Sequence, residues 1–358
     1  MSKVAAATTV THVSDSAPTT APVQKNARPR IAWIDIAKGV AILAIVAGHC
    51  IAQNSLTKNI LFSFHVPLFF ILTGYTFGLS KTFKDFLRRT VKDFLHLIIP
   101  TVLMVGAYGI LRILIFGADP AEEFHNFLVK LFWSSGTGVY ITASAHMWLP
   151  WFFVATFFAK LFLRILYLIF KDNYKIISIL CGFVGVAFLD KGFALPFGIS
   201  TALVGLFFMV TGVFAKDYQN IIQKYRIPLF IIATFLLYGY LRRGLTIDIA
   251  LYIISLDTII EAFCSCFIVC EVCKILADLK IARKLLSLIG KNTMMIATVH
   301  YLDWTFNFLY KQDNLYLRMI VRILLVLVYA WAFTVVFHGI CRCLRFLRNR
   351  HIKRKVVA

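Results

Sequence analysis

The chain has 358 residues, of which 60% are hydrophobic and only 15% are charged, and its mean hydropathy is +0.79. A soluble domain is about half apolar and about a quarter charged, so this composition excludes an ordinary soluble domain, a disordered chain, a coiled coil and a disulfide scaffold. The apolar residues form long runs, which predict an all-α, polytopic membrane helix bundle. Basic residues in the short loops account for the net charge of +21, a pattern typical of membrane topology signals and anionic lipid contacts.

The chain divides into three parts. Residues 1–30 are rich in Ala, Thr, Ser and Pro and lack an apolar core, so we expect a disordered cytoplasmic tail there. A membrane domain is expected over residues 31–341, followed by a basic cytoplasmic tail over residues 342–358. About ten transmembrane helices are predicted within the domain, near 32–53, 59–79, 94–116, 147–170, 175–190, 195–215, 227–241, 249–275, 285–309 and 316–340.

The loops carry basic residues in the alternating pattern that ten spans require. Loops after even-numbered spans are strongly basic and the opposite loops are not, so the positive-inside rule places both termini in the cytoplasm. Segment 81–93 has Phe83, Phe86 and Leu87 near helical spacing among basic residues. This spacing predicts a helix on the inner membrane surface, with a solvated charged loop as the alternative. The sequence shows no internal repeat of the kind found in inverted-repeat transporters.

The first span carries three polar residues, although a charge inside a span costs at least about 2.5–3.5 kcal/mol. Asp35 and Lys38 are three residues apart and share a helix face. His49 follows eleven residues after Lys38, which returns almost to the same face about 16 Å further along the axis. We therefore expect one polar stripe facing the bundle interior. The alternative for Asp35 and Lys38 is an ion pair that only orients the span near the interface.

The second span places His65 two residues before Pro67. The proline removes one backbone hydrogen bond and frees a carbonyl, which is typical of helices that line a cavity. Under the predicted topology His65 lies at a depth close to that of His49. Two imidazoles at one depth indicate a catalytic pair, and the alternative is that His65 braces the broken helix.

Later spans contribute further polar residues. His146 and Trp148 lie at the outer start of the fourth span, where an aromatic belt is the alternative role. Glu261 in the eighth span is positioned either to accept a hydrogen bond from a histidine or to pair with an arginine. His300 and Asp303 share a face of the ninth span. The cysteines at 264, 266, 270 and 273 lack the paired spacing of zinc sites, so no metal site is predicted.

Two segments of the sequence, WIDIAKGVAILAIVAGH and FSFHVPLFFILTGYTF, resemble the start of the acyltransferase-3 family of integral-membrane acyltransferases. The resemblance continues through HMWLPWFFVATFFAK, ALPFGISTALVGLFFMVTGVFAK and LIGKNTMMIATVH, in the family's order. The closest likeness is to the stand-alone branch that includes fucose 4-O-acetylase-like and polysaccharide O-acetyltransferase proteins. Lys38 stands where the family generally has Arg, which keeps the charge but loses the bidentate fork, and Thr73 stands where many members have Ser.

The resemblance implies transfer of an acyl group, usually acetyl from acetyl-CoA, to a hydroxyl of a cell-surface or lipid-linked carbohydrate, in a bacterial plasma membrane. No bound cofactor, metal or nucleic acid is expected. His49 is expected to act as general base or to carry the acyl group, and His65 to orient the acceptor or stabilise the oxyanion. The other residues expected to contact the donor or acceptor are Asp35, Lys38, Tyr75, His146, Trp148, Glu261 and His300.

Two other classes of function are consistent with polar residues inside spans. An exporter or flippase of a surface polysaccharide or lipid-linked sugar would also need a polar path, although the lack of repeated halves argues against it. A regulatory partner of a synthase would keep the chemistry intact after loss of both histidines. Ester-linked acyl groups on the polymer distinguish the enzyme from the exporter.

Overall fold

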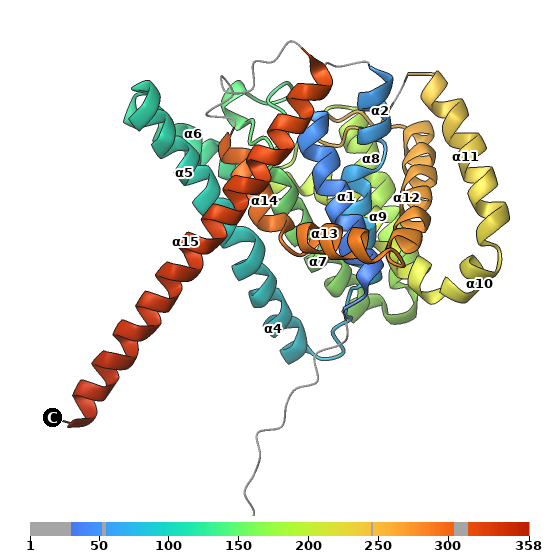
Figure 1. Ribbon diagram of the computed structural model, residues 1–358. Coiled ribbons are helices and arrows are strands. Elements are labelled where there is room, and N and C mark those ends of the chain that lie inside the picture. Colours follow the sequence, from blue (N-terminus) through green and yellow to red (C-terminus); the bar gives the residue numbers. More distant parts are fainter. Residues whose placement is uncertain (1–29, 52–54, 245, 304–313, 358) are drawn as a thin grey trace, which may run out of the picture. The chain divides into compact units, whose positions relative to one another are not determined.

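The computed structural model describes residues 30–51, 55–244, 246–303 and 314–357, with side-chain surroundings up to residue 336. It is 81% helical, and the described residues form no strand, which confirms the all-α prediction. The expected disordered tail over residues 1–30 lies almost entirely outside the described residues. The helices shown in Figure 1 are α1 (Ala32–Gly48), α2 (Leu56–Phe62), α3 (His65–Tyr75), α4 (Phe83–Asp93), α5 (Ile99–Phe116), α6 (Pro120–Trp133), α7 (Trp151–Phe170), α8 (Tyr174–Asp190), α9 (Ile199–Asp217), α10 (Gln219–Lys224), α11 (Arg226–Arg242), α12 (Leu256–Leu276), α13 (Lys280–Lys291), α14 (Thr293–Asp303) and α15 (Leu315–Val357).

Five helical stretches of the described chain are long and apolar enough to cross a membrane. They are Leu56–Tyr75, Phe83–Phe116, Trp151–Asp190, Pro196–Asp217 and Leu315–Val336. The third stretch has 40 residues and contains both α7 and α8, which pack against each other beyond a break at Lys171. Helix α1 has only 17 residues, and α12 carries four charged residues. Ten spans and cytoplasmic termini therefore stay predictions.

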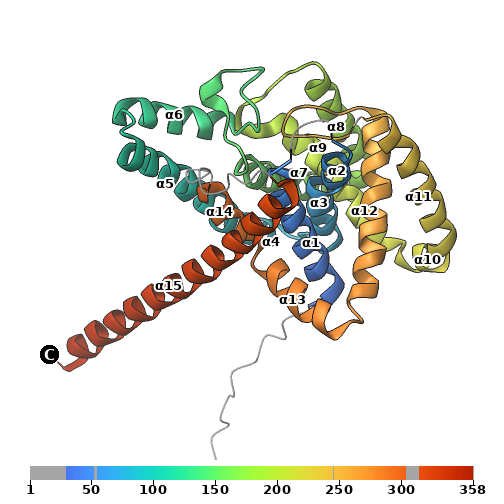
Figure 2. The ribbon, with the colours of Figure 1, turned by 45° about the horizontal axis from the view of Figure 1, so that its top comes forward.

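Several predicted spans differ from the observed helices. The second is divided between α2 and α3 at residues 63–64, and the ninth is divided between α13 and α14 at Asn292. Segment 81–93 is helical, as predicted: the Thr82 hydroxyl accepts the Asp85 backbone N–H at 3.2 Å at the start of α4. Helix α4 then continues through a π-turn (Phe94–Ile98) into α5. Helix α15 has no boundary at residue 341 and runs to Val357 (Figure 2).

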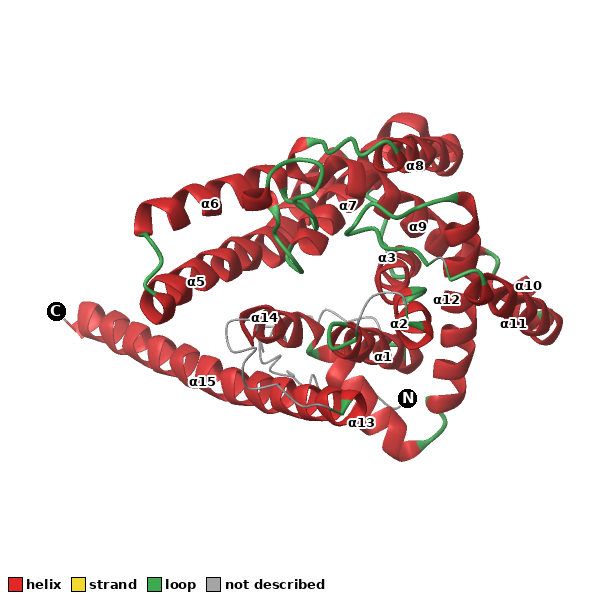
Figure 3. Cartoon of the chain, turned by 90° about the horizontal axis from the view of Figure 1, so that it is seen from above, coloured by secondary structure: helices red, strands yellow, loops and turns green. Residues whose placement is uncertain are grey.

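Helix α1 contacts α2, α3, α12, α13, α14 and α15. Its approach to α13 requires glycine on both helices: a Cβ on Gly39 would lie 2.4 Å from the Leu286 carbonyl oxygen, and one on Gly290 would lie 1.7 Å from the Asp35 carbonyl oxygen. Small residues at helix interfaces allow such close backbone packing. Figure 3 shows α1, α2, α3 and α12 grouped side by side, in agreement with their contacts.

Three apolar clusters hold the helices together. One contains buried residues of α3, α7 and α9, a second joins α1 to α3 and α12, and a third joins α1 to α5, α14 and α15. Helix α1 belongs to two of these clusters, and α3 likewise belongs to two. The polar residues of α1 and α3 are thereby fixed by packing on several sides, which sets the positions of the side chains described next.

Candidate active site

A cavity of about 630 Å³ lies among α1, α2, α3, α7 and α14 and two connecting loops. Lys38 of α1 lines the cavity, and so does His49 in the turn directly after α1. His65 at the start of α3 lines it as well. His146 and Trp148 line it from the loop before α7. Five of the nine site residues predicted from the sequence therefore meet at one cavity.

His49 contacts a second histidine rather than standing alone. Its Nδ1 lies 2.9 Å from Nε2 of His300, and the two rings stack with centroids 5.1 Å apart. His300 is only 2% exposed and lies on α14. It is not among the residues that line the 630 Å³ cavity, so its contact is with the His49 ring and with a small adjoining pocket.

A buried ion pair continues this contact beyond His300. Asp303 Oδ1 lies 3.5 Å from His300 Nδ1, and the Arg322 guanidinium donates to both Asp303 carboxylate oxygens, at 3.1 and 3.3 Å. The side chains of Asp303 and Arg322 are 1% and 3% exposed. A two-point arginine contact keeps a buried carboxylate ionised, because the pair is far less costly to bury than either charge alone.

These contacts select one tautomer for each ring. An ionised Asp303 only accepts, so it favours a proton on His300 Nδ1 even at 3.5 Å, which is longer than a normal hydrogen bond. With its proton on Nδ1, a neutral His300 would accept at Nε2, and His49 would donate its Nδ1–H across the 2.9 Å contact. In this tautomer Nε2 is the unprotonated nitrogen of the His49 ring. An imidazole in this state is able to take a proton from a substrate.

His65 has different surroundings. Its Nδ1 lies 3.0 Å from the Leu61 carbonyl oxygen, which accepts the ring N–H, and its ring meets Phe62 edge to face at 4.4 Å. The break between α2 and α3 leaves the Leu61 carbonyl free for this bond. The carbonyl of Ser63, four residues before Pro67, accepts the Ser265 hydroxyl at 2.9 Å instead. His65 therefore braces the broken helix and also lines the cavity with its Nε2 able to accept.

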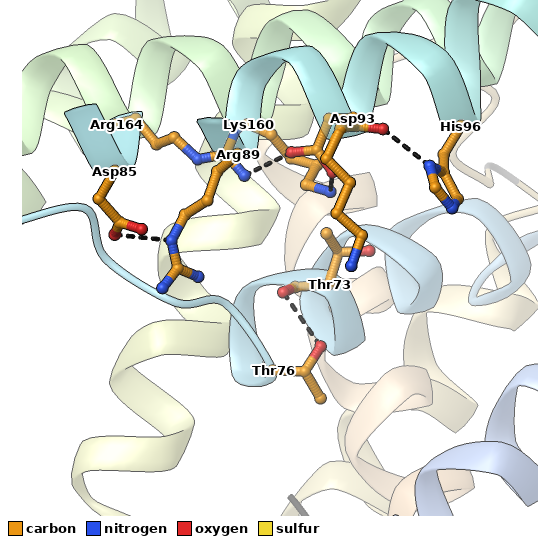
Figure 4. A network of polar contacts seen from close by, with 9 residues as sticks. Thr73, Thr76, Asp85, Arg89, Asp93, His96, Lys160 and Arg164 are labelled. Atoms are coloured by element: carbon orange, nitrogen blue, oxygen red, sulfur yellow. Dashed lines mark hydrogen bonds and ion pairs between the residues drawn. The ribbon is translucent and has the colours of Figure 1, made fainter. Parts of the chain in front are cut away.

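The end of the cavity that includes Lys38, here called the Lys38 end, lies near a largely buried charge cluster of Asp93, Lys160 and Arg164. Figure 4 shows the side chains of this cluster. Asp93 accepts from both Lys160 and Arg164, so two cations share one carboxylate. Arg164 is 4% exposed, and its Nε and Nη1 have no hydrogen-bond partner within the described chain. Lys38 is close enough to act electrostatically on Lys160. The cluster carries excess positive charge and unused donors, which suits an anionic group.

The opposite end, here called the loop end, contains Lys58, Asp248, His146 and Trp148. The His146 and Trp148 rings stack with centroids 4.2 Å apart. Burial raises the pKa of Asp248 to about 6, against the opposing effects of the Leu251 backbone N–H and the Lys58 ammonium. Lys58 and Asp248 are not among the site residues expected from the sequence, because both lie just outside predicted spans, at 59–79 and 249–275.

Three predicted site residues, Asp35, Tyr75 and Glu261, do not line the cavity. Tyr75 donates to Gln219 at 3.0 Å. Glu261 accepts from Thr246 at 3.3 Å and is fully buried. Within the described residues no three His, Cys, Asp or Glu side chains are placed to hold a metal ion.

Comparison with known proteins identifies the domain. The family model described as an acyltransferase domain, of the acyltransferase-3 type, matches residues 31–339. No curated protein matches the chain, and no solved structure matches it. The match begins at the first residue of the predicted membrane domain and includes His49, His300 and Arg322.

Proposed function

The chain belongs to the acyltransferase-3 family, and its apolar helices indicate a membrane acyltransferase; we propose that it transfers an acetyl group from cytosolic acetyl-CoA to a hydroxyl of a cell-surface or lipid-linked carbohydrate. The contact between His49 and His300, backed by Asp303 and Arg322, is the observation that carries this proposal. It fixes the His49 imidazole at a cavity of about 630 Å³, a volume typical of ligand sites.

His49 acts as the general base. Its Nε2 removes the proton from the acceptor hydroxyl, and the oxygen forms a bond to the thioester carbonyl carbon. The tetrahedral intermediate then expels the CoA thiolate, which receives the proton from the His49 imidazolium. Asp303 stabilises that imidazolium through His300, while Arg322 keeps Asp303 ionised. His300, Asp303 and Arg322 are thus positioning residues that act through His49.

His65 orients the acceptor. Because its Nδ1–H is donated to Leu61, its free Nε2 accepts the hydrogen bond of a hydroxyl and has no proton for an oxyanion. Of the two roles expected from the sequence, the tautomer of His65 therefore favours acceptor orientation.

The donor approaches from the Lys38 end. Acetyl-CoA carries phosphates, and the cluster of Lys160 and Arg164 with Lys38 nearby offers buried donors for an anion. Lys38 lies about 16 Å along α1 from His49, a distance that an extended pantetheine arm spans. We therefore expect the Lys38 end to face the cytoplasm and the acceptor to enter from the other side of a bacterial plasma membrane.

Replacement of His49 tests the proposal. We expect His49→Ala to lower acetyl transfer in membranes by about 10²–10⁴-fold, the usual contribution of a general base. His125→Ala, which removes an exposed histidine on α6, is the matched control and is expected to retain transfer. Expression is confirmed by immunoblot. Near-normal transfer by His49→Ala would end the assignment, and retained esters with polymer trapped inside the cell would favour an exporter.

A further inference from the structure

The loop end of the cavity is built by two loops, residues 134–150 (the first loop) and residues 246–255 (the second loop). The two loops are fixed against each other, and the second loop is also fixed against α2. Thr246 donates to the Asn59 carbonyl at 3.3 Å and to Glu261 at 3.3 Å, and this ties the second loop to α2 and α12. Gly136 of the first loop lies so close to Ala250 that a Cβ there would be 2.7 Å away. Both loops therefore have one defined position at the cavity.

Asp248 is held at the start of a closed turn. Its backbone N–H and carbonyl both bond to Ile253 at 2.9 Å, and its Oδ1 accepts the Leu251 backbone N–H at 3.2 Å. The backbone N–H of Ala250 also acts on this carboxylate. Asp248 is among the residues that line the cavity, so the turn fixes its carboxylate at a position where lone pairs of its oxygens can accept from a ligand.

Lys58 enters the same cavity from α2. It is 8% exposed, and its Nζ lies 4.7 Å from the centroid of the Phe62 ring, which also packs against His65. Both Lys58 and Asp248 are described, yet no ion pair joins them. An ammonium and a carboxylate that share a cavity without contact leave space for a ligand that uses both.

Trp148 and His146 supply a flat aromatic surface at this end. Their rings stack at 4.2 Å with an angle of 18° between their planes, and Trp148 is 38% exposed. Trp148 has a backbone φ of +60°, a conformation that costs on the order of 1–3 kcal/mol for a residue other than glycine. The cost is compensated by contacts that hold the indole at the cavity.

We propose that Asp248, Lys58 and the stacked Trp148 form the binding subsite for an uncharged polyhydroxylated ring, a neutral sugar, at the loop end of the cavity. This inference rests on the proposed function, since it names the chemical class of the acceptor and the residues that select it. Asp248 accepts from one hydroxyl, Lys58 donates to another, and the indole covers the apolar face of the ring. The Phe62 ring contacts His49, His65 and Lys58, and so it joins this subsite to both histidines.

The charges explain why the ring is neutral. A ring that bears a carboxylate or phosphate would gain from Lys58 but would meet the Asp248 carboxylate in the same buried space. The subsite therefore favours neutral sugars over their uronic-acid counterparts. The excess positive charge at the Lys38 end has no equivalent here, so the two ends of the cavity select ligands of different charge.

Equilibrium binding to the full-length protein in detergent tests the subsite. The probes are neutral oligosaccharides of glucose, galactose and mannose and the corresponding uronic-acid oligosaccharides, titrated without acetyl-CoA. We expect at least one neutral probe to bind in a saturable manner, at least about tenfold more tightly than its uronic counterpart. Asp248→Asn keeps an oxygen for the Leu251 N–H and should weaken that binding about tenfold, the usual effect of losing a charged hydrogen bond. Lys58→Met should also weaken the binding of the neutral probe about tenfold.

The control pair replaces the exposed residues of another ion pair, Asp190→Asn and Lys191→Met, and both are expected to bind as the wild type does. Unchanged affinity in Asp248→Asn and Lys58→Met, preference for the uronic probes, or no saturable neutral probe would each overturn the subsite. Acetyl transfer that depends on His49 would then still stand. Conversely, neutral-sugar binding that depends on Asp248 without any acetyl transfer would retain the subsite and remove the enzymatic proposal.

Discussion

His49 and His65 line the same cavity, yet the regions behind them differ. Behind His49 lies a series of ionisable groups from two helices, His300 and Asp303 of α14 and Arg322 of α15. Behind His65 lies a backbone carbonyl of its own helix break and an aromatic ring. An ionised carboxylate that acts through a second imidazole stabilises an imidazolium, whereas a backbone carbonyl only fixes the orientation of a neutral ring. The difference assigns proton transfer to His49 and orientation to His65.

The largest expected effect tests the charged region. Arg322→Met leaves Asp303 buried without its cation, and we expect a loss of about 3–5 kcal/mol in stability. Thermal unfolding in detergent measures it. The double variant Arg322→Met/Asp303→Leu removes both charges and should recover most of that loss. A double variant as unstable as the single one would show that the pair is not the source of the cost.

Asp303→Asn is expected to have the next largest effect, on turnover rather than on binding. The neutral amide no longer favours the tautomer that leaves a lone pair on His49, so kcat should fall about a hundredfold while KM for donor and acceptor changes little. Initial rates of acetyl transfer per folded protein measure this. Asp217→Asn makes the same change in an exposed ion pair with Lys175 and should retain kcat. Equal kcat in the two variants would contradict a role for Asp303.

A pair of substitutions separates the two roles of His65. Asn places an amide N–H near the position of Nδ1 and keeps the bond to Leu61, whereas Gln reaches toward the position of Nε2. We expect His65→Asn to fold normally and to raise the acceptor KM about tenfold. His65→Gln should retain more acceptor affinity but unfold at lower temperature. The opposite ranking in acceptor KM would make His65 only a brace for α2 and α3.

The smallest expected effect is a pH dependence of acceptor binding. Burial raises the pKa of Asp248 to about 6, so its carboxylate becomes protonated as the pH falls through 6. Lys58 is the charged group that acts on the Asp248 carboxylate. The acceptor KM should therefore rise several-fold between pH 7 and pH 5. Asp248→Asn should remove this rise, and a rise of equal size in that variant would assign the dependence to another group.

Local signals in the sequence predicted much of the site. Eleven-residue spacing placed Lys38 and His49 on one face of α1, and Pro67 marked the break beside His65. Three-residue spacing paired His300 with Asp303. The same signals gave wrong or incomplete boundaries: the ninth predicted span is two helices that meet at Asn292, and residues 249–255 are a loop rather than the start of α12. Hydropathy averages over such breaks, because the residues around them are as apolar as the helices.

By itself, the sequence determined the class of the protein, its helical content and the helix faces that carry polar residues, since composition and helical periodicity are properties of neighbouring residues along the chain. The tertiary structure decided which of those residues meet. Arg322 contacts Asp303 rather than Glu261, Arg164 contacts Asp93, and Asp248 faces the cavity shared with Lys58. The reason is that a buried charge must find an opposite charge or a hydrogen-bond partner, and the available partner is set by which helices pack together.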